Sequence, residues 1–166
     1  MFISGGSSGI GEALAKRMAD LNAKKIIIAA RRQEELLRVK RECSRPEIIE
    51  TFTIDLDKPE EVLTKCEHLF AKEEVDIVIN NGGISMRDFF EDLDFSVCIK
   101  MMNVNVISHM AVCKAVIPGM IARKKGGKIC NVNSVSGYLS NPMRSMYCAS
   151  KWSLNGFSKV LRIELS

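Results

Sequence analysis

"SGGSSGIGEAL", residues 4–14, is the stretch that decides how the rest of the chain is interpreted. It follows a short apolar stub, residues 1–3, and leads into apolar side chains at helical spacing, at Ile10, Leu14, Met18 and Leu21. Glycine lets a main chain approach another group closely, and a helix N-terminus offers free N–H groups to an anion. The stretch therefore fits a phosphate-binding turn between a strand and a helix, and it also fits an ordinary strand–helix turn.

The length and composition indicate one ordinary globular domain. A chain of 166 residues can bury a sizeable core, and 46% hydrophobic against 27% charged residues is the balance of a folded protein. The net charge of +4 is too small to favour nucleic-acid binding, and we interpret the basic run Arg123-Lys124-Lys125 as a solvated helix end. Six cysteines without a Cys-x-x-Cys pair indicate reduced thiols.

The sequence shows no continuous run of about 18 apolar residues and no basic-then-apolar leader at its start. We therefore expect a protein of the cytoplasm or associated with the endoplasmic reticulum. Membrane attachment is expected only if an N-terminal anchor precedes Met1.

Short apolar runs alternate with longer amphipathic ones along the chain. Strands are predicted at residues 25–30, 50–56, 75–80 and 127–134, after the opening stub. Helices are predicted at residues 10–21, 58–72, 94–121 (with an apolar face that ends near Pro118 and Gly119) and 145–165. This alternation predicts an α/β fold over residues 1–166: a Rossmann-type, doubly wound parallel sheet in a single domain, with helices on both faces.

The end of the second predicted strand bears on the choice of nucleotide. In such folds an acidic residue about 20 positions past the glycines binds the ribose of NAD, whereas an arginine there accommodates the 2′-phosphate of NADP. Twenty residues past Gly11 stands Arg31, followed by Arg32, and the nearest acids are Glu34 and Glu35. The pattern favours NADP(H) over NAD(H). The alternative is that Arg31 and Arg32 only open a surface helix, which is the simpler interpretation for Arg32.

Candidate catalytic residues follow in a consistent order. Tyr147 and Lys151 lie one helical turn apart, so a lysine ammonium beside the phenol would favour proton exchange with a substrate oxygen. Ser134 ends the fourth predicted strand, and residues 80–83 (NNGG) end the third at the same sheet edge. Asn105 lies inside a predicted helix, where asparagine is unfavourable. Each feature alone has an ordinary structural explanation, but together they indicate an active site.

At this point the whole chain resembles the short-chain dehydrogenase/reductase family, and within it the branch of retinal and steroid reductases related to 11β-hydroxysteroid dehydrogenase. The resemblance rests on six motifs: SGGSSGIG at 4–11, DL at 55–56, NNGG at 80–83, VNV at 104–106, VNS at 132–134 and YCASK at 147–151. It implies an NADP(H)-dependent oxidoreductase that acts on a carbonyl or secondary alcohol, such as a steroid-, retinoid- or lipid-like ketone.

The resemblance also implies roles for individual residues. Tyr147 would be the acid–base catalyst, Lys151 would assist it and hold the nicotinamide ribose, Ser134 would bind the substrate oxygen, and Asn105 would hold a relay water. The cofactor would also contact these residues: Gly5, Ser7, Ser8, Gly9, Ile10, Arg31, Asp55, Leu56, Asn81 and Gly82. No metal is expected, because His68 and His109 show no ligand spacing.

Several positions depart from the family pattern. Ser4 stands where the family usually has threonine, Gly82 replaces an alanine, and Asn133 replaces a first serine. Family members continue beyond this last helix with further strands and a substrate-binding segment. We therefore expect the sheet to lack its C-terminal strands and the chain to be truncated at both ends.

Three further expectations concern partners and neighbouring residues. The resemblance implies a homodimer or homotetramer through helices 94–121 and 145–165. Met86 and Arg87 either border the substrate pocket or lie in a solvated loop, and Cys148 is expected to be packed rather than reactive. A non-catalytic cofactor-binding or scaffold protein with the same fold is the alternative function.

Overall fold

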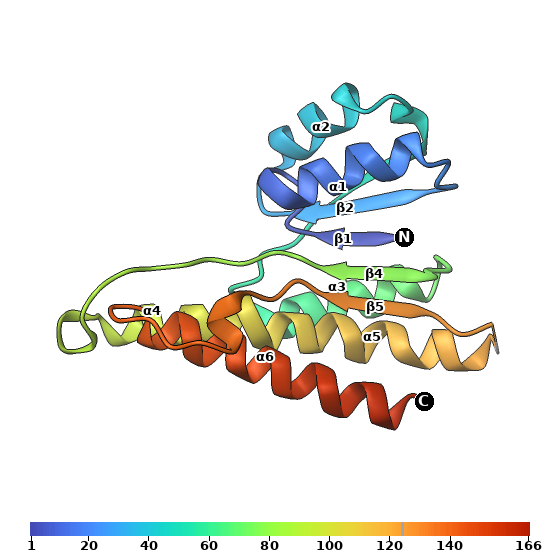
Figure 1. Ribbon diagram of the computed structural model, residues 1–166. Helices are drawn as coiled ribbons and strands as arrows, with labels where there is room; N and C mark the ends of the chain where they lie inside the picture. The colour runs from blue at the N-terminus through green and yellow to red at the C-terminus, as the bar shows by residue number, and fades with distance from the viewer. Residues whose placement is uncertain (124) are drawn as a thin grey trace.

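A five-stranded parallel sheet organises the chain in the computed structural model, which describes residues 1–123 and 125–166 (Figure 1). The strands lie in the order β3-β2-β1-β4-β5, so the chain moves outward from β1 and then crosses back to β4. Ligands bind at such a reversal, beyond the carboxyl ends of the strands. The strands are β1 (Phe2–Ser4), β2 (Ile26–Ala30), β3 (Ile49–Thr53), β4 (Ile77–Asn80) and β5 (Lys128–Asn131).

Helices cover both faces of the sheet (Figure 1). On one face, α1 (Gly9–Asp20) and α2 (Gln33–Glu42) pack on Ile3, Ile26 and Ile28. On the other, α3 (Pro59–Phe70) and α5 (Ser108–Ala122) pack on Phe2 and Val78. The helix α4 (Phe95–Met102) precedes α5, and α6 (Ser145–Glu164) contacts α4. Because neighbouring strand residues point to opposite faces, apolar runs such as 26–29 serve both cores. The predicted doubly wound α/β fold is confirmed.

The predicted helix 94–121 is found as two helices joined by a π turn. Asp94 caps α4 by accepting a hydrogen bond from Ser96 N at 2.7 Å, and the π turn Asn103–Ile107 connects α4 to α5. The helix continues past Pro118 to Ala122, one residue beyond the predicted range 94–121. Buried Val116 and Met120 hold the chain helical on either side of the proline. Lys124, part of the predicted basic helix end, lies outside the described residues.

Other elements also differ from the prediction. The strand predicted at residues 50–56 is β3, which ends at Thr53, so Asp55 and Leu56 lie in the turn that follows it. The fourth predicted strand ends at Asn131, so Ser134 lies three residues beyond β5 in the turn that follows. The helix α2 was not predicted as an element, because its residues are mostly charged and only Leu36 and Val39 are buried. Arg32 is the N-cap residue of α2, as the alternative interpretation of this residue anticipated.

The combined segment Phe95–Ala122 is long and apolar enough to cross a membrane by length and composition alone. Of its most apolar window, 56% is buried inside the protein. A core helix passes the same test, so this feature is weak evidence for a membrane span.

Candidate active site

The glycine turn brings the ends of β1 and β4 together. Gly5 has a φ of +68°, and a Cβ there would lie 2.6 Å from Gly82 Cα. A Cβ on Gly11 would lie 2.2 Å from the Gly5 carbonyl oxygen. Only glycine fits at these two positions, because the main chains of the turn and of the first helical residues nearly touch. The turn is therefore built for close approach rather than for flexibility.

The side chains of Ser4 and Asn81 connect the turn after β1 to the segment after β4. The Ser4 hydroxyl accepts hydrogen bonds from Asn81 N at 3.0 Å and from Gly82 N at 3.1 Å. The Asn81 amide donates to Ser4 O at 3.1 Å and to Gly5 O at 3.4 Å. The serine in place of threonine thus still supplies the oxygen that the β4 turn needs. A Cβ on Gly82 would lie 2.3 Å from Leu56 Cδ1, so an alanine at this position would require the Leu56 side chain to move.

A cavity of about 380 Å³ lies beyond the glycine turn. Nine of the predicted cofactor residues line it: Gly5, Ser7, Ser8, Ile10, Arg31, Asp55, Leu56, Asn81 and Gly82. Gly9, Tyr147 and Lys151 are not among its lining residues, although Gly9 opens α1 with a φ of +58°. Sequence reasoning assigned no role in it to Ala30, Ile54, Gly83, Ile84, Lys100 and Val104.

The main chain and the cations that border the cavity suit an anionic group such as a nucleotide phosphate. The floor of the cavity is main chain at glycine positions, where a side chain would fill the space. The N-terminus of α1 lies beside the cavity, as an anion site requires. At the end of β2 stand Arg31 and Arg32, and Arg31 is 61% exposed with its Nε 3.9 Å from Asp55 Oδ1. This distance is too long for a strong ion pair, so the guanidinium is available to a bound anion.

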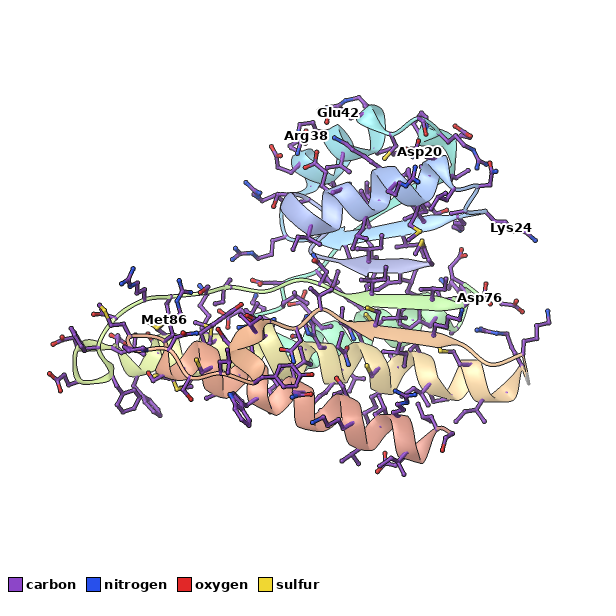
Figure 2. The ribbon with its side chains drawn as sticks, viewed as in Figure 1. Asp20, Lys24, Arg38, Glu42, Asp76 and Met86 are labelled. Carbon is purple, nitrogen blue, oxygen red and sulfur yellow. The ribbon has the colours of Figure 1, made fainter. Side chains whose placement is uncertain are left out.

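An ion-pair network supports the turn from the side of α2. Arg38 Nη2 lies 2.9 Å from Glu12 Oε2 and donates to the Ser7 carbonyl at 3.3 Å. Arg38, and after it Lys16, lowers the pKa of Glu12 to about 2, so the carboxylate stays ionised. Figure 2 labels Arg38 together with Glu42, which also lies on α2 and pairs with Arg38 at 2.9 Å. The network ties α2 to the first turn of α1.

Asn105 is fully buried in the π turn, and its side chain holds the segment after β4. Its Oδ1 accepts from Ile84 N at 2.8 Å, and its Nδ2 donates to Ile84 O at 2.9 Å and to Ser150 Oγ at 3.0 Å. Ser150 in turn donates to Tyr147 O at 2.8 Å. The amide therefore links the cavity wall to the helix that carries Tyr147. The amide protons of Asn105 are engaged in these bonds, whereas its Oδ1 accepts only from Ile84 N and keeps a second lone pair for a further donor such as water.

The other three predicted catalytic residues lie around the start of α6. The Lys151 ammonium is nearly buried, donates to Val132 O at 3.0 Å and lies 5.9 Å from the centre of the Tyr147 ring. Burial lowers the pKa of Lys151. Ser134 accepts from Ser136 N at 3.1 Å within its own turn. The Arg144 guanidinium carbon lies 5.6 Å from the centre of the same ring.

His109 is a buried residue of α5 to which the sequence analysis assigned no role as a metal ligand. It lies one helical turn after Asn105 and is fully buried, and neither ring nitrogen has a hydrogen-bond partner among the described residues. Burial, and after it the charge of Lys151, lowers the pKa of His109 to about 4, although the main chain of Gly82 acts in the opposite direction. The imidazole is therefore neutral at physiological pH. Its position one turn from Asn105 was the available signal that it borders the site.

The remaining singled-out residues have simple positions. Met86 is half-buried and Arg87 exposed on the loop that extends from β4 (Figure 2). Cys148 is buried as expected, with its thiol 3.9 Å from Leu139 O. Within the described part of the chain, no three His, Cys, Asp or Glu side chains gather as a metal site would need.

Comparison with known proteins agrees with this architecture. A family model described as short chain dehydrogenase matches residues 1–166. The chain is 39% identical over 173 residues to dehydrogenase/reductase SDR family member 7 of Homo sapiens, covering 100% of this chain and 50% of that protein. It is 33% identical over 168 residues to very-long-chain 3-oxoacyl-CoA reductase of Homo sapiens, covering 98% and 53%. The chain thus spans about half the length of the curated relatives it matches.

Solved structures give the same result. A metagenomic short-chain oxidoreductase in complex with NADP superposes with a TM-score of 0.91 at 28% identity, covering 99% of this chain and 75% of that one. A short-chain dehydrogenase from Streptomyces avermitilis superposes with a TM-score of 0.90 at 26% identity, covering 99% and 60%. The family model and the fold agree over the full length of the sequence, and this chain belongs to the short-chain dehydrogenase family.

Proposed function

We propose that this chain carries the NADP(H) site and the catalytic groups of an oxidoreductase that interconverts a carbonyl and a secondary alcohol. The observation that carries the proposal is the cavity itself, which joins a glycine turn, two arginines after β2 and the wall held by Asn105. A structural neighbour in complex with NADP supports the choice of nucleotide. NAD(H) is less favoured, because arginines stand where an acidic residue would bind its ribose.

The residues of the site would have separate binding and catalytic roles. The turn residues Gly5, Ser7, Ser8, Gly9 and Ile10 would hold the pyrophosphate, Arg31 the 2′-phosphate, Asp55 and Leu56 the base, and Asn81 and Gly82 the ribose. When bound, NADPH supplies hydride to the carbonyl carbon. Tyr147 would give a proton to the carbonyl oxygen, Ser134 would hold that oxygen, and Lys151 would keep a positive charge beside the phenol. Asn105 would position the wall and the relay water.

An apolar substrate fits the surface around these groups. Phe89 and Phe90 are exposed on the loop after β4, and Val135 and Leu139 are exposed on the segment after β5. The two segments meet where Asp88 N donates to Met143 O at 3.0 Å. Exposed apolar side chains beside polar catalytic groups suit a steroid-, retinoid- or lipid-like carbonyl compound. A relative named for reducing very-long-chain 3-oxoacyl-CoA supports the same class.

We also propose that the chain assembles as a homodimer or homotetramer through the α4–α5 segment and α6. Large apolar side chains are exposed on these helices, among them Phe95, Ile99, Trp152, Val160 and Ile163. Sedimentation at two protein concentrations tests this, and a monomer at both would contradict it. We further propose that the protein is found in the cytoplasm or associated with the endoplasmic reticulum. Imaging of the tagged protein in cells tests this location.

The function is tested by NADPH oxidation with a panel of steroid, retinoid and long-chain aliphatic ketones. Tyr147→Phe should lower turnover by about a hundred- to ten-thousandfold, the usual contribution of a positioned acid, without weakening NADPH binding. Tyr138→Phe is the matched control, because the Tyr138 hydroxyl bonds Asn155 at 3.3 Å and none of the predicted catalytic residues, so its loss should leave turnover unchanged. NADPH binding without turnover of any ketone would instead favour a non-catalytic cofactor-binding or scaffold protein.

A further inference from the structure

Lys100 is a cation in the proposed cofactor cavity to which neither the motifs nor the proposed mechanism assigns a role. It lies on α4, one helical turn before Val104, and both residues line the cavity. Residues three or four apart share a helix face, so Lys100 on α4 and Val104 in the π turn that follows lie on the side that borders the cavity. The Lys100 side chain is 45% exposed, which leaves its ammonium accessible to a ligand.

Lys100 and Arg31 each lie near one aspartate of the turn that follows β3. Lys100 Nζ lies 3.9 Å from Asp57 Oδ2, whereas Arg31 Nε lies 3.9 Å from Asp55 Oδ1. The three-residue turn 55–57 therefore lies between two cations, with Arg31 at the end of β2 and Lys100 on α4. Both contacts are too long for strong hydrogen-bonded ion pairs. The two cations thus stand on different walls of one cavity and are both free to bind a ligand.

The wall beside Lys100 is apolar. Leu56 and Val104 are buried, Ile54 lies next to them, and all three line the cavity. A slot of aliphatic side chains with an ammonium at its rim suits a flat aromatic group, because the ring packs on the aliphatic carbons and its π face or ring nitrogens meet the cation. A phosphate would instead need several donors around it, which this wall does not offer.

We propose that Lys100 binds the adenine base of the cofactor, whereas Arg31 binds the 2′-phosphate. The proposal rests on the proposed NADP(H) function and adds a residue that sets cofactor affinity without setting the choice between NADPH and NADH. Since adenine is common to both cofactors, Lys100 acts on both alike. Arg31 acts on NADPH alone.

The test is Lys100→Met, which keeps the length and apolar stem of the side chain and removes its charge. Dissociation constants for NADPH and for NADH are measured by the fluorescence of the reduced cofactor. We expect both constants to rise about three- to tenfold, the range for a cation on an aromatic ring at a half-exposed site, with an unchanged NADPH/NADH ratio. Lys100→Arg should restore most of the affinity, because a guanidinium also packs on an aromatic ring.

Lys114→Met is the matched control, since Lys114 is an exposed lysine on α5 outside the cavity and its loss should leave both constants unchanged. Unfolding midpoints of all variants are compared, so that lost affinity is not confused with lost folding. Unchanged constants in Lys100→Met overturn the inference, and so does a rise for NADPH alone, which would make Lys100 a phosphate ligand. If the unmodified chain binds neither cofactor, the proposed function fails, and the inference fails with it.

Discussion

The turn after β1 and the network around Asn105 border the same site but are held by different parts of the chain. In the turn, main chain packs against main chain where Gly5 meets Gly82 and where Gly11 meets the Gly5 carbonyl, with the Asn81 amide beside these contacts. Around Asn105, a single side chain joins the segment after β4 to α6 through three polar contacts. The first region depends on glycines at the points where main chains meet, and the second depends on one buried amide side chain.

This difference predicts that the turn tolerates added atoms least. Gly11→Ala places a Cβ 2.2 Å from the Gly5 carbonyl oxygen, and the main chain cannot move away without disturbing the turn. We expect a loss of about 3 kcal/mol in the free energy of unfolding, together with a large loss of NADPH affinity. Urea unfolding and fluorescence titration measure the two effects.

Gly156→Ala provides the control, because Gly156 lies on α6 with nothing within 4 Å of the added Cβ. That substitution should stabilise the protein by up to about 1 kcal/mol, as alanine favours a helix over glycine. Equal effects of the two substitutions would show that the turn is not closely packed.

The burial of His109, one helical turn from Asn105, has a smaller and pH-dependent effect on the free energy of unfolding. Its pKa is about 4 in the folded protein and 6.5 in the reference state, so the unfolded chain binds the proton first as the pH falls. Stability is therefore lost on acidification between these values. From pH 7.5 to pH 5 the loss assigned to this residue is about 2 kcal/mol.

His109→Leu should remove that part of the acid sensitivity, measured as the difference between unfolding free energies at pH 7.5 and pH 5. His68→Gln is the control, because His68 is exposed on α3 and its replacement should leave the difference unchanged. The same acid loss in His109→Leu as in the parent protein would contradict the assignment.

The two regions also differ in how far the sequence predicted them. The turn is local: strand, glycines and helix follow one another within residues 1–14, and each element has a clear pattern. The residues Asn105, Tyr147 and Lys151 were predicted as candidates. Their contacts were not, because Asn105 meets Ile84 and Ser150 across 21 and 45 residues of chain.

Other differences have similar physical causes. The helix α2 carries little apolar signal, since its stability comes from Leu36 and Val39 and from ion pairs with α1. The helix continues through Pro118, because packing of its neighbours outweighs the local preference of proline. Lys100 belongs to no motif, and only the fold brings its helix to the cavity.

The central claim is that the cavity beyond the glycine turn binds NADP(H) and that Arg31 recognises its 2′-phosphate. The most direct test is a fluorescence titration of the chain and of Arg31→Met with NADPH and with NADH. We predict that the parent protein binds NADPH at least about tenfold more tightly than NADH, and that Arg31→Met removes most of this difference while NADH binding stays the same. Equal affinity for both cofactors in the parent protein, or binding of neither, would contradict the claim.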